Sequence, residues 1–234
     1  MLSVVTTCNP DLRIMQDFIR SLSDEASRSG ISIEMVIVND LSVPGINKLS
    51  QHGTALTSVR TLNHLDRKGQ LPATLDGIAV AAGDAILAMD PDMSTNIPDI
   101  HRFLEALRAG SDVVYGFRAS RFDTSPSRRL ASRIMGRLVA TISGLPMHDP
   151  NSPMVMLSRA AALRIPETLT LGSSPKLWMP HLFSKSFTEI PISLHAPSGS
   201  ASSYSLADLI RLSFSQLRDA YQFRRAVSRQ RAHR

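Results

Sequence analysis

The sequence is poor in the features that mark secreted and membrane-spanning proteins. Its 234 residues include a single cysteine, Cys8, so no disulfide can form within the chain and a reducing compartment suits it. No stretch approaches the roughly 18 consecutive apolar residues of a membrane span. The first residues lead directly into a strand-like segment, without the charged start or cleavage site of a signal peptide. We therefore expect a cytoplasmic protein, and the 43% hydrophobic content predicts a globular one.

Net positive charge is also absent outside one segment. The net charge of +6 is accounted for by residues 211–234, which contain seven arginines and one acid, Asp219. Such a tail suggests an anionic partner, namely lipid head groups, nucleic acid or an acidic protein, or else a solvated basic end. Few aromatic residues, among them Tyr221 and Phe223, interleave these bases and no recognition motif is present, so we do not expect a nucleic-acid partner.

Short apolar runs alternate with helical patterns along the chain. This order predicts an α/β fold with a mostly parallel sheet and helices on both faces. We expect one domain over residues 1–205, divided near residue 116 into nucleotide-binding and acceptor-side halves, and a basic amphipathic helix within 206–234. The expected strands are 4–6, 33–38, 57–62, 85–89, 113–115, 154–157 and 187–194, and the expected helices are 12–27, 44–51, 69–82, 98–108 and 127–142.

Two details of these helices are also expected. Gly83 should end the helix over 69–82, because glycine is common just after a helix. The helix over 127–142 should turn one apolar face to the core, formed by Leu130, Ile134, Leu138 and Ile142.

Asp90-Pro91-Asp92 directly follows the apolar strand expected at 85–89. Alternate residues of a strand point the same way, so both carboxylates can face one divalent cation. Mg²⁺ and Mn²⁺ prefer such oxygen ligands and share them with substrate phosphates. The alternative is a polar turn with two solvated aspartates.

Other polar groups follow neighbouring strands. Thr7-Cys8-Asn9 and Asn39-Asp40 come after the first two expected strands. In open sheets of this kind ligands bind beyond the carboxyl ends of the strands, so these groups and Asp90-Pro91-Asp92 should share one ligand-binding rim.

Two basic segments suggest contacts with anions. Six arginines crowd residues 118–137 and predict either a solvated helix face or an anion clamp, because guanidinium binds phosphate through two hydrogen bonds. In the tail an apolar stripe follows helical spacing, and we expect it to lie in a lipid interface or to pack on the domain or a second subunit. The stripe contains Leu206, Leu209, Ile210, Ser213, Phe214, Leu217 and Tyr221.

Six blocks of the chain follow one another in a recognisable order, at residues 36–42, 69–77, 82–92, 112–118, 128–133 and 144–149. Together they resemble the inverting family 2 nucleotide-sugar glycosyltransferases, and within them the dolichol-phosphate mannose synthase-like, or polyprenyl-phosphate, branch. The resemblance spans about residues 2–210. It implies a Rossmann-like nucleotide-sugar-binding domain of the glycosyltransferase A type.

The resemblance implies a role for each matching position. Thr6, Asn9 and Asp40 would line the base and ribose pocket, and Lys68 and Gly69 would lie near the GDP- or UDP-sugar.

Asp90 and Asp92 would hold Mg²⁺ or Mn²⁺ on the diphosphate. Arg118 and Arg129 would bind the acceptor phosphate, with Arg128 and Arg133 as alternatives to Arg129. Asp149 would lie near the sugar, and it is our candidate general base if the acceptor is a hydroxyl; otherwise Asp149-Pro150 starts a turn.

Some positions depart from the family pattern. They bear on the identity of the sugar and the acceptor rather than on nucleotide and metal binding. The departures are Pro10, Asn39, Leu41, Ser94, Val155 in place of an arginine, and a 200–204 segment without its arginine and lysine.

We expect an enzyme that transfers a sugar to a polyprenyl phosphate on the cytoplasmic face of a membrane. The alternatives are a family 2 transferase with a saccharide or other soluble acceptor, and a degenerate relative that only binds. Without a span, the chain would dock peripherally, recruit a membrane-protein partner or use a soluble acceptor.

Overall fold

The computed structural model describes the chain except for residues 52–54, 121–125, 145–147, 150–151, 166–185, 194–213, 215–216, 219, 226–227 and 229–234. For residues 50–51, 71, 93–95, 119–120, 126–133 and 193 the description covers the backbone alone.

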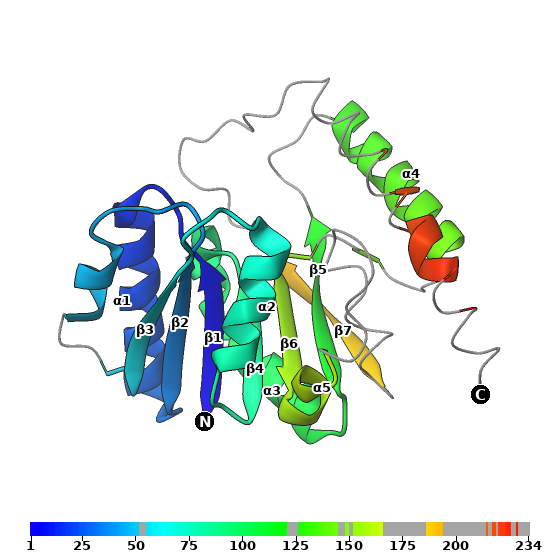
Figure 1. Cartoon of the computed structure of the whole chain (residues 1–234). Coiled ribbons are helices and arrows are strands. Elements are labelled where there is room, and N and C mark those ends of the chain that lie inside the picture. Colours follow the sequence, from blue (N-terminus) through cyan, green and yellow to red (C-terminus); the bar gives the residue numbers. More distant parts are fainter. Residues whose placement is uncertain are drawn as a thin grey trace.

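Seven strands form one sheet in the order β3-β2-β1-β4-β6-β5-β7 (Figure 1). The pairings β1–β2, β2–β3, β1–β4 and β5–β7 are parallel, and β6 is antiparallel to β4 and β5. The mostly parallel sheet is thereby confirmed. The strands are β1 Leu2–Thr7, β2 Ile33–Asn39, β3 Ser58–Asn63, β4 Ala85–Met89, β5 Val113–Ser120, β6 Met154–Ser158 and β7 Phe187–Ser193.

Helices cover both faces of the sheet. The helices are α1 Leu12–Ser29, η1 Ile46–Gln51, α2 Gln70–Val80, η2 Pro91–Asp99, α3 Ile100–Arg108, α4 Pro126–Ser143 and α5 Arg159–Leu163, where η marks a 3-10 helix. Strand side chains alternate between two hydrophobic clusters, as Leu87 and Ile86 do. The first cluster includes α1 and α3, and the second includes α2 and α5, which gives a three-layer α/β domain (Figure 1).

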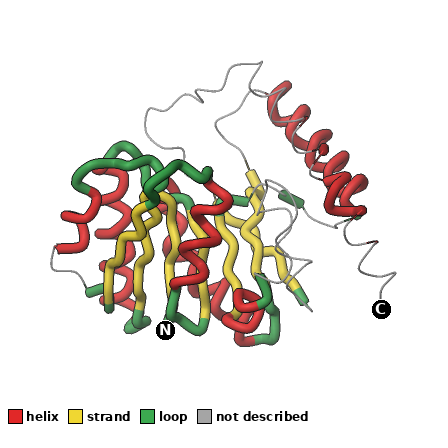
Figure 2. The backbone as a smooth tube through the Cα atoms, in the orientation of Figure 1, coloured by secondary structure: helices red, strands yellow, loops and turns green. Residues whose placement is uncertain are grey.

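The chain direction places one set of loops at one edge of the sheet. In Figure 2 the loops after β1, β2 and β3 lie together above the sheet. Because β6 runs opposite to both β4 and β5, strands β4 and β5 point the same way. The carboxyl ends of β1–β5 and β7 and the start of β6 therefore share this edge, here called the carboxyl rim.

Gly83 does not end helix α2, so that prediction was wrong. The helix ends at Val80, and Ala81 follows in an extended conformation. A Cβ atom at Gly83 would lie 2.7 Å from the backbone nitrogen of Ser3 and 2.8 Å from the carbonyl oxygen of Met1. Glycine is needed here for the close approach of two backbone segments.

Helix α4 packs through a face that includes Ile142 of the predicted set but not Ile134 or Leu138. Ile134 and Leu138 are 50% and 43% exposed, whereas Val139 is buried. Val139 belongs to the second hydrophobic cluster, with Met135 and Ile142 packed against it. Apolar residues thus lie on two adjacent faces of this helix. The face with Met135, Val139 and Ile142 contacts the cluster, and the face with Ile134 and Leu138 does not.

The described part of the C-terminal segment is helical at 214, 217–218, 220–225 and 228. Ala220 and Phe223 are buried in the cluster that contains Val139, whereas Phe214 and Tyr221 are 70% and 56% exposed. Of the predicted stripe, Leu217 packs against this cluster while Phe214 and Tyr221 are exposed, and its members 206, 209, 210 and 213 lie outside the described residues. Within the described part, none of the helices combines the length and apolar character needed to cross a membrane.

Candidate functional site

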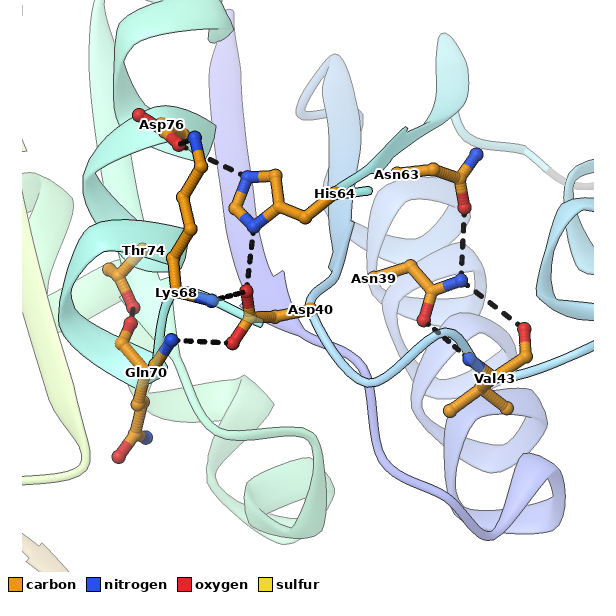
Figure 3. Close-up of polar contacts among 10 residues, drawn as sticks. Asn39, Asp40, Val43, Asn63, His64, Lys68, Gln70, Thr74 and Asp76 are labelled. Atoms are coloured by element: carbon orange, nitrogen blue, oxygen red, sulfur yellow. Dashed lines mark hydrogen bonds and ion pairs between the residues drawn. The ribbon is translucent and has the colours of Figure 1, made fainter. Parts of the chain in front are cut away.

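Asp40 fixes the loop that enters helix α2 (Figure 3). Its Oδ1 accepts a hydrogen bond from the backbone N–H of Lys68, and its Oδ2 accepts one from Gly69, both at 2.8 Å. His64 Nδ1 lies 2.7 Å from Oδ1. Burial alone would raise the pKa of Asp40, but the hydrogen bonds from His64 and from the two backbone groups outweigh it and lower that pKa.

His64 and Lys68 converge on a second carboxylate (Figure 3). Lys68 Nζ pairs with Asp76 Oδ2 at 2.7 Å. His64 Nε2 lies 3.1 Å from the same oxygen, within ion-pair distance although it is not aligned as a hydrogen bond. The buried imidazole therefore bridges Asp40 and Asp76, and the first turns of α2 are fastened to the end of β2.

Asn39, which replaces the first aspartate of the family pair, holds the next turn. Its Oδ1 accepts from the backbone N–H of Val43 at 2.8 Å, and its Nδ2 donates to the carbonyl oxygen of Val43 and to Asn63 Oδ1. An amide supplies both a donor and an acceptor, which a carboxylate cannot do. Asparagine at position 39 is therefore compatible with the local structure, because both groups of its amide are hydrogen-bonded.

Thr6 and Asn9 lie at the end of β1. Thr6 is buried, and its hydroxyl donates to the carbonyl oxygen of Thr7. Asn9 Oδ1 accepts from the backbone N–H of Asp11 at 2.9 Å, one residue before α1. Both side chains thus make contacts within the chain, and their predicted contact with a nucleotide stays a prediction.

Asp90 and Asp92 lie where β4 meets η2. Asp90 directly follows β4, and its backbone N–H donates to the carbonyl oxygen of Pro153. Its side chain is partly exposed and accepts a hydrogen bond from Gln70 Nε2 at 3.0 Å. Asp92 is exposed in the first turn of η2.

Arg118 and Asp149 are paired with each other. Arg118 Nε lies 2.5 Å from Asp149 Oδ2, and its terminal nitrogen lies 2.9 Å from Oδ1. The side chains are only 19% and 11% exposed. The family resemblance implied separate roles for these two residues, and their pairing was not predicted.

The neighbouring residue, His148, is clamped to the last strand. Its ring Nδ1 lies 2.7 Å from Glu189 Oε2, and its backbone N–H donates to Oε1 at 2.9 Å. The ring also stacks on Phe117 at 4.9 Å between centroids. Residues 148 and 149 are thereby held against β5 and β7.

Arg129 lies within helix α4, and its side chain is outside the described ones. Three rim residues were missed: His64, Gln70 and Glu189. The rule that polar residues after parallel strands share a rim could have found His64, which directly follows β3. Gln70 is marked only by its place after Gly69, and no sequence signal marks Glu189.

A family comparison agrees with this geometry. The family model described as Glycosyl transferase family 2 matches residues 3–165. The chain belongs to this family. The family model covers the whole carboxyl rim except its contribution from β7.

Two curated proteins illustrate how similar the chain is to individual relatives. The chain is 28% identical over 222 residues to the undecaprenyl-phosphate 4-deoxy-4-formamido-L-arabinose transferase of Pseudomonas aeruginosa (strain LESB58), covering 92% of this chain and 63% of that protein. Over 89 residues, 38% of this chain and 25% of the relative, it is 29% identical to the dolichol-phosphate mannosyltransferase of Pyrococcus furiosus. The chain thus spans less than two thirds of the length of these relatives.

Solved structures show the same fold at low identity. Glucosyl-3-phosphoglycerate synthase from Mycobacterium tuberculosis, in complex with Mn²⁺, UDP-glucose and phosphoglyceric acid, is 14% identical with a TM-score of 0.60, covering 96% of this chain and 79% of that one. TarS from S. aureus with UDP-GlcNAc has 14% identity and a TM-score of 0.53, covering 92% and 66%. These matches confirm the glycosyltransferase A type of fold.

Proposed function

We propose that this protein is a metal-dependent inverting glycosyltransferase that moves a sugar from a nucleoside-diphosphate donor to a polyprenyl phosphate. The main support is the likeness over 92% of the chain to a transferase whose name specifies undecaprenyl phosphate. The dolichol-phosphate mannosyltransferase is named for an acceptor of the same chemical class. UDP-sugars in the neighbouring structures support a nucleotide sugar as donor.

Asp90 and Asp92 fit a divalent cation shared with the donor. Within the part of the chain that the structure describes, no group of three or more His, Cys, Asp or Glu side chains forms a complete metal site. Two partly exposed or exposed carboxylates at the rim suit Mg²⁺ or Mn²⁺, which complete their oxygen shell with substrate phosphates. When bound, such a cation would neutralise the charge that develops on the leaving diphosphate.

The donor would lie along the rim from β1 to β4. The loop held by Asp40 places Lys68 and Gly69 beside Gln70, which contacts Asp90. In this arrangement Thr6, Asn9 and Asp40 shape the nucleotide side of the site. Asp40 acts through the backbone that it fastens, because its two oxygens already accept hydrogen bonds from that loop.

The acceptor would approach from the side of β5. A polyprenyl phosphate is already an anionic nucleophile, so its attack on the anomeric carbon needs no general base. Arg118 is held by Asp149 at this side of the rim, and Arg129 lies on α4, which follows β5. Their guanidinium groups would orient the phosphate and stabilise its charge. In this proposal Asp149 orients Arg118.

The membrane side of this proposal rests on the C-terminal helix. Its exposed face carries Phe214, Arg218, Tyr221 and Arg225 at helical spacing, and Arg225 lies over the Tyr221 ring at 5.9 Å. Aromatic and basic side chains on one face suit an anionic lipid surface. We propose peripheral binding to the cytoplasmic face of a membrane.

A transfer assay would test this function. GDP- and UDP-sugars are each incubated with Mn²⁺ and either a short polyprenyl phosphate or saccharide acceptors, and products are identified by mass spectrometry. Sugar-phosphate-polyprenol formation, lost in EDTA and in Asp92→Ala, is expected. Transfer only to saccharides would replace the acceptor assignment. Nucleotide binding without any transfer would favour a degenerate binding protein.

A further inference from the structure

Gln70 joins helix α2 to the first aspartate of the proposed metal pair. Its Nε2 donates to Asp90 Oδ1 at 3.0 Å, across 20 positions of sequence. Gln70 is the first residue of α2, whereas Asp90 follows β4. A glutamine amide is a neutral donor, so it can fix a carboxylate without cancelling the charge that a cation requires.

Three features of the surrounding chain hold the start of helix α2, where Gln70 lies. The preceding residues, Lys68 and Gly69, donate their backbone N–H groups to Asp40. The Thr74 hydroxyl donates to the carbonyl oxygen of Gln70 at 2.8 Å. Gly77 lets the helix approach the sheet closely, since a Cβ atom there would lie 2.5 Å from Val5 Cγ1.

We propose that Gln70 is a positioning residue for Asp90, one that sets the orientation in which this carboxylate meets the divalent cation. The inference rests on the metal-dependent function proposed above. Mg²⁺ demands near-octahedral geometry, so its affinity depends on the orientation of each ligating carboxylate. Hydrogen-bonding partners behind metal-ligating carboxylates orient them, and removing such partners typically lowers metal affinity by about 10- to 100-fold.

The hydrogen bond between Gln70 and Asp90 should contribute little to the stability of the folded protein. Gln70 is exposed and Asp90 is partly exposed, so water replaces the hydrogen bond readily. Removal of the Gln70 amide should therefore weaken cation binding and leave the stability of the metal-free protein nearly unchanged.

Three full-length proteins would separate these effects: wild type, Gln70→Leu and Thr74→Val. Leucine keeps the bulk of Gln70 but cannot donate to Asp90. Valine removes the other side-chain contact to Gln70, at its backbone carbonyl, and leaves the amide in place. Free Mn²⁺ is measured by electron paramagnetic resonance during titration with saturating UDP. UDP binding without metal and metal-free thermal unfolding are measured alongside.

We expect Gln70→Leu to raise the Mn²⁺ dissociation constant about tenfold or more, with metal-free UDP affinity and unfolding temperature unchanged, and Thr74→Val to match wild type. Equal Mn²⁺ affinity in Gln70→Leu and wild type would overturn the positioning role and leave the proposed function intact. An equal loss of Mn²⁺ affinity in Gln70→Leu and Thr74→Val would also overturn the positioning role, because disturbance of the first turn of α2 would then explain both losses. If wild type itself binds no Mn²⁺ with UDP, the proposed function fails.

Discussion

The guanidinium of Arg118 and the carboxylate of Asp149 meet through two parallel contacts, Nε to Oδ2 at 2.5 Å and the terminal nitrogen to Oδ1 at 2.9 Å. They come from β5 and from the loop before the antiparallel strand β6. Burial raises the pKa of Tyr115 on the same strand well above its ordinary value, and the charges of Asp149 and Glu189 add to this effect. Tyr115 therefore stays protonated.

Arg118→Lys should weaken use of a phosphate acceptor, because lysine cannot make the paired contacts of a guanidinium. Hydrogen bonds to charged groups contribute about 1.5–3 kcal/mol, so we expect the acceptor KM to rise roughly 10- to 100-fold. Donor affinity, measured by calorimetry, should not change. Arg137→Lys, an exposed position on α4, is the matched control.

Asp149→Asn separates the two roles considered for this carboxylate. If Asp149 orients Arg118, the variant should raise the acceptor KM and keep the shape of the pH–rate profile. A large fall in kcat, with loss of the acidic limb of that profile and an unchanged acceptor KM, would instead identify Asp149 as the general base.

Asp40→Asn should destabilise the protein by about 1–3 kcal/mol, because the new amide has one acceptor oxygen and leaves one of the partly buried backbone donors, at Lys68 or Gly69, without its charged acceptor. Urea unfolding measures this loss. Asp11→Asn is a suitable control, since asparagine serves equally well at the start of α1.

The effect of Asp40→Asn should depend on pH. The folded chain lowers the pKa of Asp40 below its ordinary value of 3.8, so the carboxylate stabilises the fold fully above that value. This contribution is lost as the pH falls through the lower, folded-state pKa. The stability difference between wild type and Asp40→Asn should therefore be constant near pH 7 and shrink below about pH 4. A difference that stays constant to pH 2 would contradict this role.

Gly77→Ala and Gly136→Ala make a matched pair of helix substitutions. Each gains up to about 1 kcal/mol of helix propensity. At Gly136 the nearest atom to a new Cβ is 3.8 Å away, so that gain should appear as increased stability. At Gly77 the Cβ would meet Val5 at 2.5 Å and Val38 at 2.8 Å, so α2 must move off the sheet. Thermal unfolding should show opposite signs for the two variants.

The mostly parallel sheet and the edge at which polar residues follow its strands could be predicted from the sequence. Apolar runs bounded by turns located the strands, and parallel direction alone implied that Asn9, Asp40 and Asp90 follow strand ends at one edge. The pairing of Arg118 with Asp149 could not be predicted in this way. It depends on β6 entering the sheet between β4 and β5 in the opposite direction, which local patterns do not specify.

Helical spacing likewise determined that α4 exists but not how it packs. Ile134 and Leu138 follow helical spacing as well as Met135, Val139 and Ile142 do, and the second hydrophobic cluster selects the latter set. The same ambiguity applies to the C-terminal helix, where Leu217 of the predicted stripe packs beside the buried Ala220 and Phe223, which the prediction left out. Phe214 and Tyr221 stay exposed and are available to contact a surface outside the domain.

The exposed face of the C-terminal helix gives a prediction for membrane binding. Each basic residue near an anionic surface contributes about 1 kcal/mol. Arg218→Gln combined with Arg225→Gln should therefore weaken binding to phosphatidylserine-containing vesicles roughly 30-fold in co-sedimentation. Arg13 and Arg20 on α1 are also exposed, and glutamine at both positions removes equal charge elsewhere. Equal losses in the two double variants would mean that net charge alone attracts the protein, whereas loss in the C-terminal pair alone places the lipid contact on that face.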